Sequence, residues 1–152
     1  MDRLERLEAI EAIRDLKARY FRLIDTKQWD ALPGIFAHDL KILTPDGTVW
    51  LEGGQAYAES LKFGLSSAVS CHQGFTGEID VLDDGTASGV WAMQDIIHWQ
   101  ESHPREGWKA ITGRGHYHET YRKQGASWRI ATLSLTRLSL DIEWPEGDPR
   151  ND

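Results

Sequence analysis

The chain has 152 residues, a formal net charge of −7 and a single cysteine, Cys71. This length suits one compact domain. A lone cysteine excludes an internal disulfide and any zinc site built from several cysteines. The acidic balance argues against binding to a nucleic-acid backbone, which requires clustered lysine and arginine.

The composition is that of an ordinary globular protein. Hydrophobic residues make up 40% of the chain and charged residues 27%, so nothing indicates disorder or a fibrous fold. The apolar runs are much too short to cross a bilayer, and the first residues alternate in charge instead of forming a signal sequence. We therefore expect a soluble protein of the cytoplasm that binds neither membrane nor nucleic acid.

The first part of the chain has helical periodicity. Apolar residues recur at steps of three and four over 4–23, which predicts an amphipathic helix of about six turns. A second, short helix is predicted over 29–36, where Pro33 is tolerated only near the start. A third helix is predicted over roughly 55–65, after the glycine pair 53–54.

From residue 69 onward the period changes to two. Four long strands are predicted over 69–82, 86–100, 109–123 and 127–144, joined by short connections that suit an antiparallel meander. Two short strands are predicted before them, near 40–42 and 49–51, on either side of the turn sequence TPDGT. Several glycines inside the long strands indicate bulges and bends; they are Gly74, Gly77, Gly89, Gly113 and Gly115.

Helices followed by a curled sheet predict an α+β fold in which the helices cover one face of the sheet. A strongly curved antiparallel or mixed sheet closed by helices makes a cone-shaped α+β barrel, and the concave wall of such a cone is where small molecules usually bind. We expect a single domain over 1–152, with 144–152 as a frayed tail.

The stretch SCHQGF, residues 70–75, carries the first candidate for chemistry. Successive side chains of a strand point to opposite faces, so Cys71 and His72 cannot form a thiolate–imidazolium pair. We expect Cys71 to be a small buried hydrophobe. His72 needs a partner to become a positioned base, and the candidate is Asp25, at the end of the first helix.

The residues leave two interpretations of Asp25 open. In the structural one, Asp25 caps the second helix, since DTKQ is an Asp-x-x-Gln capping box. In the functional one, its carboxylate accepts a hydrogen bond from one ring nitrogen of His72. That bond would fix the tautomer of the imidazole, and the other ring nitrogen could take a proton from a substrate.

Further candidates lie on the first helix and on the long strands. Trp91, Met93 and Asp95 share one face of their strand, where Asp95 is either a surface residue at a sheet edge or a buried, protonated acid. Tyr20 lies in the apolar stripe of the first helix, as a core residue or as a proton donor in the cavity. Arg137, among leucines, is an edge charge or an anchor for an anionic or carbonyl group.

His116 and His118 share one face of the strand 109–123. His-x-His on a strand is typical of half a metal site. A cupin-type site would also need a glutamate four or five residues after His118, where Arg122 and Lys123 stand. We therefore expect no metal, and polar residues on a solvated or interface face are the simpler interpretation.

Three stretches resemble the SnoaL-like branch of the nuclear transport factor 2-like superfamily: IEAIRDLKARYFRLIDTKQWDALPGIFAHD, HQGFTGEIDVLDDGTASGVWAMQD and GRGHYHETYRKQGASWRIATLSLTRL. Bile-acid dehydratases, scytalone dehydratase and hexachlorocyclohexane dehydrochlorinase belong to this branch and eliminate water or HCl from cyclic substrates without a cofactor. The resemblance implies a catalytic Asp–His dyad at Asp25 and His72. Tyr20, Asp95 and Arg137 fall on positions of the bile-acid dehydratase pattern, whereas the dehydrochlorinase has a lysine in place of Tyr20.

The resulting hypothesis is a cofactor-independent lyase or isomerase. His72 removes a proton, and Tyr20 or a protonated Asp95 donates to the departing oxygen or to an enolate. The substrate is a small hydrophobic cyclic molecule, steroid-like or polycyclic, and we expect it to contact Trp91, Met93, His116, His118 and Arg137. The alternatives are a ligand-binding or oligomerisation module without chemistry and a small subunit of a ring-hydroxylating oxygenase. We also expect a homodimer or homotrimer.

Overall fold

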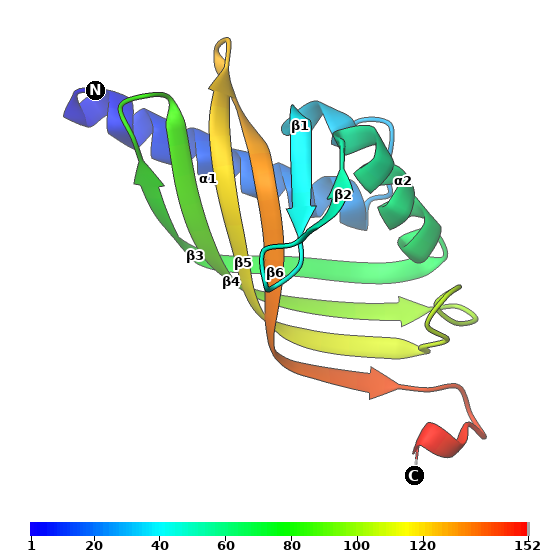
Figure 1. Ribbon diagram of the computed structural model, residues 1–152. Coiled ribbons are helices and arrows are strands. Elements are labelled where there is room, and N and C mark those ends of the chain that lie inside the picture. Colours follow the sequence, from blue (N-terminus) through cyan, green and yellow to red (C-terminus); the bar gives the residue numbers. More distant parts are fainter. Residues whose placement is uncertain (152) are drawn as a thin grey trace.

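The computed structural model describes residues 1–151, which form two α-helices, six strands and two short 3₁₀ turns (Figure 1). In chain order the elements are α1 (Arg3–Asp25), a 3₁₀ turn (Leu32–Ile35), β1 (Phe36–Leu43), β2 (Val49–Glu52), α2 (Gly54–Leu65), β3 (Ala68–Val81), β4 (Thr86–Trp99), β5 (Ala110–Gln124), β6 (Ser127–Glu143) and a 3₁₀ turn (Pro149–Asn151). The predicted first and third helices and all six predicted strands are confirmed.

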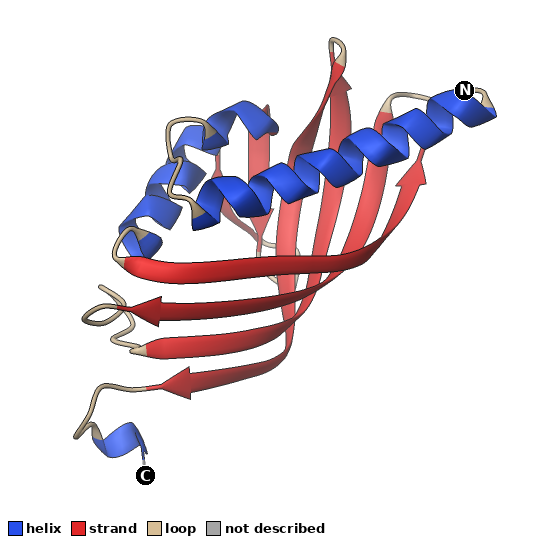
Figure 2. Ribbon diagram, turned by 180° about the vertical axis from the view of Figure 1, so that it is seen from behind, coloured by secondary structure: helices blue, strands red, loops and turns tan. Residues whose placement is uncertain are grey.

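The six strands form one mixed sheet in the order β2-β1-β6-β5-β4-β3. β1 runs parallel to β6, and the other neighbouring strands are antiparallel. Figure 2 shows α1 running across one face of the sheet while the long strands bend beneath it. We call the face that carries the helices the inner face. Within residues 1–151 no pairing joins β2 to β3, so the helices, and not a ring of strands, complete the predicted cone.

The bend of the long strands coincides with breaks in their register. The pairing of β5 with β6 shifts between Arg114 and Gly115, and that of β3 with β4 shifts between Phe75 and Glu78. A bulge adds a residue to one strand only, which bends that strand and increases its twist. The curl predicted from the glycines therefore has its source at these positions.

The hydrophobic core lies between α1 and the inner face. Ile13, Tyr20 and Ile24 of α1 are almost fully buried, and alternate residues of β4 from Ala87 to Trp99 are buried beneath them. Each such aliphatic side chain contributes about 1.5–3 kcal/mol by leaving water. The outward residues of the same strand are exposed or half-buried, as the period of two predicts.

One expectation is corrected by the structure. The predicted helix over 29–36 is only a turn followed by one 3₁₀ turn, because Pro33 lacks an N–H and Phe36 already begins β1. Within the tail, the Arg150 guanidinium lies 3.6 Å from the centre of the Trp144 ring, and the Asn151 amide donates to the backbone oxygen of Pro145. Residue 152 lies outside the described residues.

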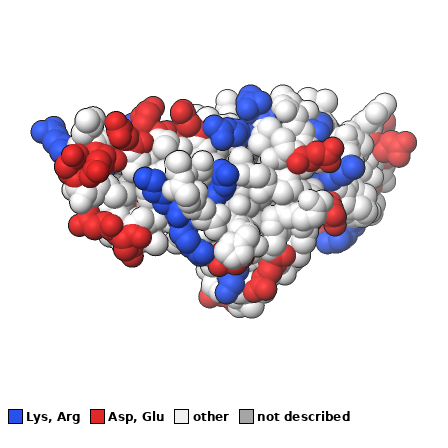
Figure 3. Space-filling view, turned by 90° about the horizontal axis from the view of Figure 1, so that it is seen from above, with Lys and Arg blue, Asp and Glu red and all other residues white. Residues whose placement is uncertain are grey.

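The surface agrees with the acidic composition. In Figure 3 acidic side chains gather at the end of the molecule where α1 begins, and acidic and basic groups are interspersed elsewhere on that face. None of the helices described within residues 1–151 is long and apolar enough to cross a bilayer.

Candidate active site

His72 occupies the inner face of β3 and lines a cavity between the sheet and the helices. Its side chain is only 7% exposed. Cys71 points to the opposite face and is exposed, so the expectation of a buried thiol is wrong, although the predicted separation from His72 is confirmed. The alternation of the strand decides both placements.

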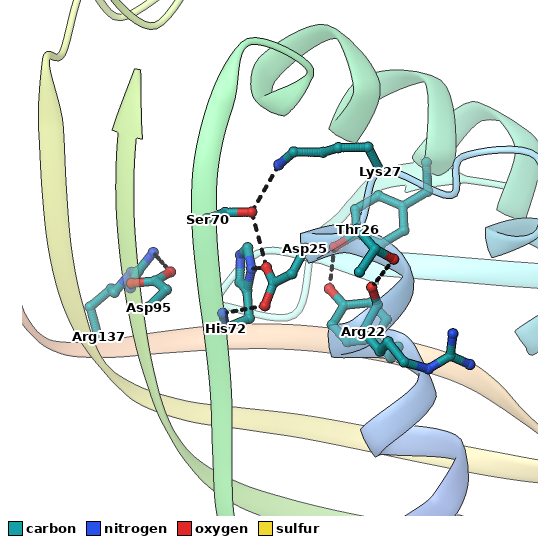
Figure 4. Close-up of polar contacts among 10 residues, drawn as sticks. Arg22, Asp25, Thr26, Lys27, Ser70, His72, Asp95 and Arg137 are labelled. Carbon is teal, nitrogen blue, oxygen red and sulfur yellow. Dashed lines mark hydrogen bonds and ion pairs between the residues drawn. The ribbon is translucent and has the colours of Figure 1, made fainter. Parts of the chain in front are cut away.

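Asp25, the last residue of α1, contacts His72 through both carboxylate oxygens (Figure 4). The Nδ1 atom of His72 lies 2.6 Å from Oδ1, and the backbone N–H of His72 donates to Oδ2 at 2.8 Å. The hydroxyl of Ser70 donates to Oδ1 at 2.9 Å. No helix begins at Asp25, so the capping interpretation is wrong and the predicted contact with His72 is present.

These contacts keep the Asp25 carboxyl ionised and determine which ring nitrogen of His72 carries the proton. Burial by itself would raise the pKa of Asp25, but the hydrogen bonds from the His72 ring and backbone, the nearby imidazole charge and the Ser70 hydroxyl outweigh it and hold that pKa below its ordinary value. An ionised carboxylate at Oδ1 requires the Nδ1 atom of His72 to carry the proton. Within residues 1–151 no hydrogen bond engages Nε2, which is left to the cavity.

The cavity has a volume of about 430 Å³ and a mixed lining. Both helices and the sheet contribute polar side chains to the lining. Tryptophan rings are contributed by β2, by the end of β4 and by the loop that follows β4. Its polar lining residues include Tyr20, Tyr57, His72, Asp95, His103, Tyr117 and Arg137, and its tryptophans are Trp50, Trp99 and Trp108. A few polar groups converging in an apolar hollow are typical of a small-molecule site.

Tyr20 is paired with a second tyrosine that the sequence reasoning missed. The hydroxyls of Tyr20 and Tyr57, from α1 and α2, lie 3.0 Å apart. Burial, followed by the neighbouring tyrosines, raises the pKa of Tyr20 well above its ordinary value, and burial raises the pKa of Tyr57 to about 12. Both phenols therefore keep their protons near neutral pH, and the pair retains one O–H that the contact between them does not use.

Asp95 and Arg137 form a bidentate ion pair on the cavity wall. Nη1 and Nη2 of Arg137 donate to the two carboxylate oxygens at 2.8 and 2.9 Å. Asp95 lies opposite His72 in the pairing of β3 with β4, so the ion pair and the dyad are neighbours (Figure 4). Both oxygens of Asp95 accept hydrogen bonds from a cation, which corrects the expectation of a protonated acid.

Gly113 makes room for this ion pair. A Cβ atom at this position would lie 1.8 Å from Nη1 of Arg137 and 2.2 Å from Oδ1 of Asp95. Any other residue here would have to displace the ends of these two charged side chains, so glycine is what leaves the ion pair undisturbed. The glycine predicted to permit a bend of the strand therefore also shapes the site.

Four predicted substrate contacts do not fit the structure. His116 and His118 lie on the outer face of β5, away from the cavity, where Nε2 of His118 lies 2.9 Å from the hydroxyl of Thr136. Trp91 and Met93 are on the inner face but are buried in the core beside the cavity, outside its lining. Arg137 alone of the five lines the cavity.

A buried polar network behind the cavity was also missed. Nζ of Lys17 donates to Glu119, whose other oxygen accepts from the Tyr121 hydroxyl, and the indole of Trp91 donates to that hydroxyl at 2.7 Å. Lys17 is four residues after Ile13 and three before Tyr20, so its position on the buried stripe of α1 was readable from the sequence. Burial lowers the pKa of Lys17, while Glu119 opposes this.

Comparisons with known proteins agree with this architecture. Residues 5–134 match the family of SnoaL-like domains. The chain belongs to the SnoaL-like domain family. Asp25 and His72 both lie within that matched region, whereas Arg137 of the cavity lining lies just beyond it.

Two curated relatives cover most of this SnoaL-like chain. The probable cyclase FGR4 of Gibberella zeae is 28% identical, over 86% of this chain and 92% of its own length. The hydroxylase subunit beta of methanesulfonate monooxygenase from Methylosulfonomonas methylovora is 26% identical, over 95% of this chain and 91% of its own length.

Solved structures share the fold at lower identity. A hexachlorocyclohexane dehydrochlorinase, LinA type 2, has a TM-score of 0.78 at 16% identity, with 93% of each chain covered. A putative scytalone dehydratase from Novosphingobium aromaticivorans has a TM-score of 0.74 at 18% identity, covering 93% of this chain and 95% of the other. Identities this low show the common fold alone. Proteins named as enzymes are thus among the distant relatives of this chain.

Proposed function

We propose that this protein is a cofactor-independent lyase or isomerase that removes a proton from a small hydrophobic cyclic substrate. The observation that carries the proposal is the contact of 2.6 Å between Nδ1 of His72 and Oδ1 of Asp25 at the cavity wall. An imidazole held in this way presents Nε2 as a base, and its partner carboxylate stabilises the imidazolium that forms.

The reaction moves one proton and one electron pair. Nε2 of His72 takes a proton from a carbon next to a carbonyl or leaving group. The electron pair of the broken C–H bond then forms an enolate or expels the leaving group as a double bond forms. The His72 imidazolium returns its proton to another carbon of the enolate in an isomerisation, or to the departing group in an elimination, which regenerates the base. A positioned base of this kind contributes about 10²- to 10⁴-fold in rate.

Hydrogen-bond donors that line the same cavity as His72 are available to the oxygen of the substrate. The Tyr20–Tyr57 pair has one free O–H, and Arg137 keeps the N–H groups that Asp95 does not use. Because burial raises the pKa of Tyr20, this phenol acts as a hydrogen-bond donor to a developing negative charge and does not surrender its proton. Asp95 holds Arg137 in place.

The cavity favours an uncharged cyclic substrate. Its volume of about 430 Å³ and its wall of Trp50, Trp99 and Trp108 suit a molecule with one or a few rings. Arg137, the cation of the lining, is already paired with Asp95, so a carboxylate or phosphate group on the substrate would find no unpaired positive charge there.

The test uses deuterium exchange, which detects proton abstraction before the natural substrate is known. Wild-type protein, His72→Ala and His98→Ala are incubated with cyclic ketones in D₂O, and incorporation next to the carbonyl is followed by NMR. His98 is the matched control because it is exposed on the outer face of the neighbouring strand. We expect His98→Ala to exchange at the wild-type rate and His72→Ala to lose about 10²-fold or more. Full exchange in His72→Ala refutes the proposal.

A second candidate function is that of an accessory subunit without chemistry of its own. The similarity to a hydroxylase beta subunit favours it. In this case the purified chain catalyses no exchange with any ketone of the panel, and Asp25→Ala leaves the affinity for a bound hydrophobic ligand unchanged. Calorimetric titration of the wild type and of Asp25→Ala with the same ketones measures this affinity, and the deuterium exchange measures the chemistry.

A further inference from the structure

The turn after α1 has an unusual residue in its left-handed position. Lys27 has a φ of 60°, and its N–H donates to the backbone oxygen of Ile24 at 3.0 Å. The N–H of Gln28 donates to the oxygen of Leu23 at 2.8 Å. These two bonds define a Schellman motif, in which glycine is the usual residue at the position of Lys27 because a Cβ atom disfavours this conformation. The backbone by itself gives no reason for a lysine here.

The side chain of Lys27 begins a chain of hydrogen bonds that leads to the dyad. Its Nζ atom donates to Oγ of Ser70 at 2.9 Å. Ser70 in turn donates to Oδ1 of Asp25 at 2.9 Å, and the same oxygen contacts Nδ1 of His72 at 2.6 Å. Figure 4 shows the four side chains joined in this order, with Ser70 and His72 on the strand, Asp25 at the end of the helix and Lys27 in the turn after it.

The direction of these bonds follows from the donors that each group has. A lysine ammonium can only donate, so Oγ of Ser70 must accept from it. The hydroxyl has a single proton, which is then directed at Asp25. Lys27 thereby keeps Ser70 as a donor to the carboxylate, and without it the hydroxyl could rotate away.

The charge of Lys27 acts in addition to this geometry. Burial lowers the pKa of Lys27 and the Asp25 carboxylate opposes this, which indicates that the ammonium is partly withdrawn from water. Besides Asp25, the titratable or charged groups that line the cavity with His72 are Tyr20 of α1, Tyr57 of α2, Asp95 of β4, His103 of the loop after β4, Tyr117 of β5 and Arg137 of β6. Asp95 and Arg137 neutralise each other, so Lys27 is the added cation on the Asp25 side of the dyad.

We propose that Lys27 is a positioning residue, which fixes Asp25 through Ser70 and makes His72 harder to protonate. The catalytic consequence rests on the proposed function, because it matters only if His72 is the base. In that case Lys27 keeps Nε2 of His72 free of a proton, and able to accept one, at lower pH than the Asp25 contact alone would allow.

The experiment measures the titration of the His72 ring by NMR in the free protein, with the signal assigned by its absence from His72→Ala. Lys27→Met removes the charge and the donor but keeps a long side chain, whereas Lys27→Arg keeps both. We expect the midpoint for His72 to rise by about half a pH unit to one unit in Lys27→Met, from the loss of a nearby cation. Lys27→Arg should remain close to the wild type.

Lys27→Gly separates this role from a structural one. Glycine suits the left-handed position, so the free energy of unfolding should be unchanged or higher. The His72 midpoint should nevertheless rise as it does in Lys27→Met. If both variants titrate within about 0.2 pH unit of the wild type, the proposal is overturned, because the lost charge should produce a larger shift. That result would overturn the role of Lys27 but leave His72 as a candidate base. Full deuterium exchange in His72→Ala would instead refute the proposed function, and the effect of Lys27 on the His72 titration would then have no catalytic meaning.

Discussion

At the scale of single residues, the candidate site concentrates hydrogen bonds on one carboxylate. Asp25 lies at the C-terminal end of a helix, where the macrodipole disfavours a negative charge. Three hydrogen bonds, two from His72 and one from Ser70, compensate for this position. The period of two places Ser70 and His72 on the same face of β3, so Ser70 could have been predicted as a neighbour of the dyad from its spacing alone.

Asp25→Asn should destabilise the protein in a pH-dependent way. The pKa of Asp25 is lower in the folded state than its ordinary value of 3.8. The carboxylate therefore adds stability that is fully present above that value and is lost as the pH falls through the folded-state pKa. We expect Asp25→Asn to lose about 2 kcal/mol near pH 6.

Urea unfolding of both proteins at about pH 6 and about pH 3 measures this linkage. The difference in free energy of unfolding between wild type and Asp25→Asn should shrink at the lower pH. A difference that is the same at both pH values would show that the ionised carboxylate is not what the hydrogen bonds stabilise.

At the scale of elements, the curvature of β5 determines where the wall of the cavity lies. Gly113 leaves space for the pair of Asp95 and Arg137, and the bulge at Gly115 changes the direction of the strand two residues later. The glycines of the sequence indicated a curled sheet. The sequence of the strand did not show that Gly113 accommodates the ion pair, or that Gly115 accommodates the backbone carbonyl group of Thr136. Those partners come from β4 and β6.

Gly115→Ala should be among the most damaging small substitutions in the sheet. A Cβ atom would lie 1.9 Å from the backbone oxygen of Thr136, which cannot rotate away as a side chain could. We expect a loss of about 3 kcal/mol in the free energy of unfolding. Gly34→Ala is the matched control, since nothing lies within 4 Å of its added Cβ and the change should be near neutral or stabilising. Equal midpoints of thermal unfolding for the two variants would contradict this account of the bulge.

At the scale of the whole molecule, α1 is joined to the sheet by a buried ion pair as well as by apolar packing. Lys17 and Glu119 are each 0–1% exposed at the side chain, and Nζ of Lys17 lies 3.6 Å from the centre of the Tyr117 ring. Such a pair is costly to desolvate, and its partners depend on each other. The end of α1 that carries Tyr20 and Asp25 is therefore held over the cavity by this contact.

Lys17→Met should destabilise the whole fold by about 3–5 kcal/mol, because it leaves the Glu119 carboxylate buried without its cation. The double variant Lys17→Met with Glu119→Gln removes both charges and should recover part of that loss. Urea unfolding of the wild type, both single variants and the double variant gives the coupling energy. Additive losses would show that the two charges do not depend on each other.

The sequence alone determined the order and type of most elements, because periodicity is a local property. Steps of three and four define α1, and alternation defines the four long strands and the opposite faces of Cys71 and His72. The error at 29–36 came from the same source, since helical spacing was followed although Pro33 falls in the middle of that stretch.

Only the tertiary structure decided which groups meet. Asp25 and His72 are 47 residues apart, and local sequence supported a helix cap for Asp25 as readily as a dyad. The pairing of Arg137 with Asp95 depends on a bulge and on Gly113, and the lysine that supports the dyad lies in a turn that has no periodicity. Contacts of this kind depend on how the helices sit across the bent sheet, which is set by packing among all the elements at once and not by any one stretch of chain.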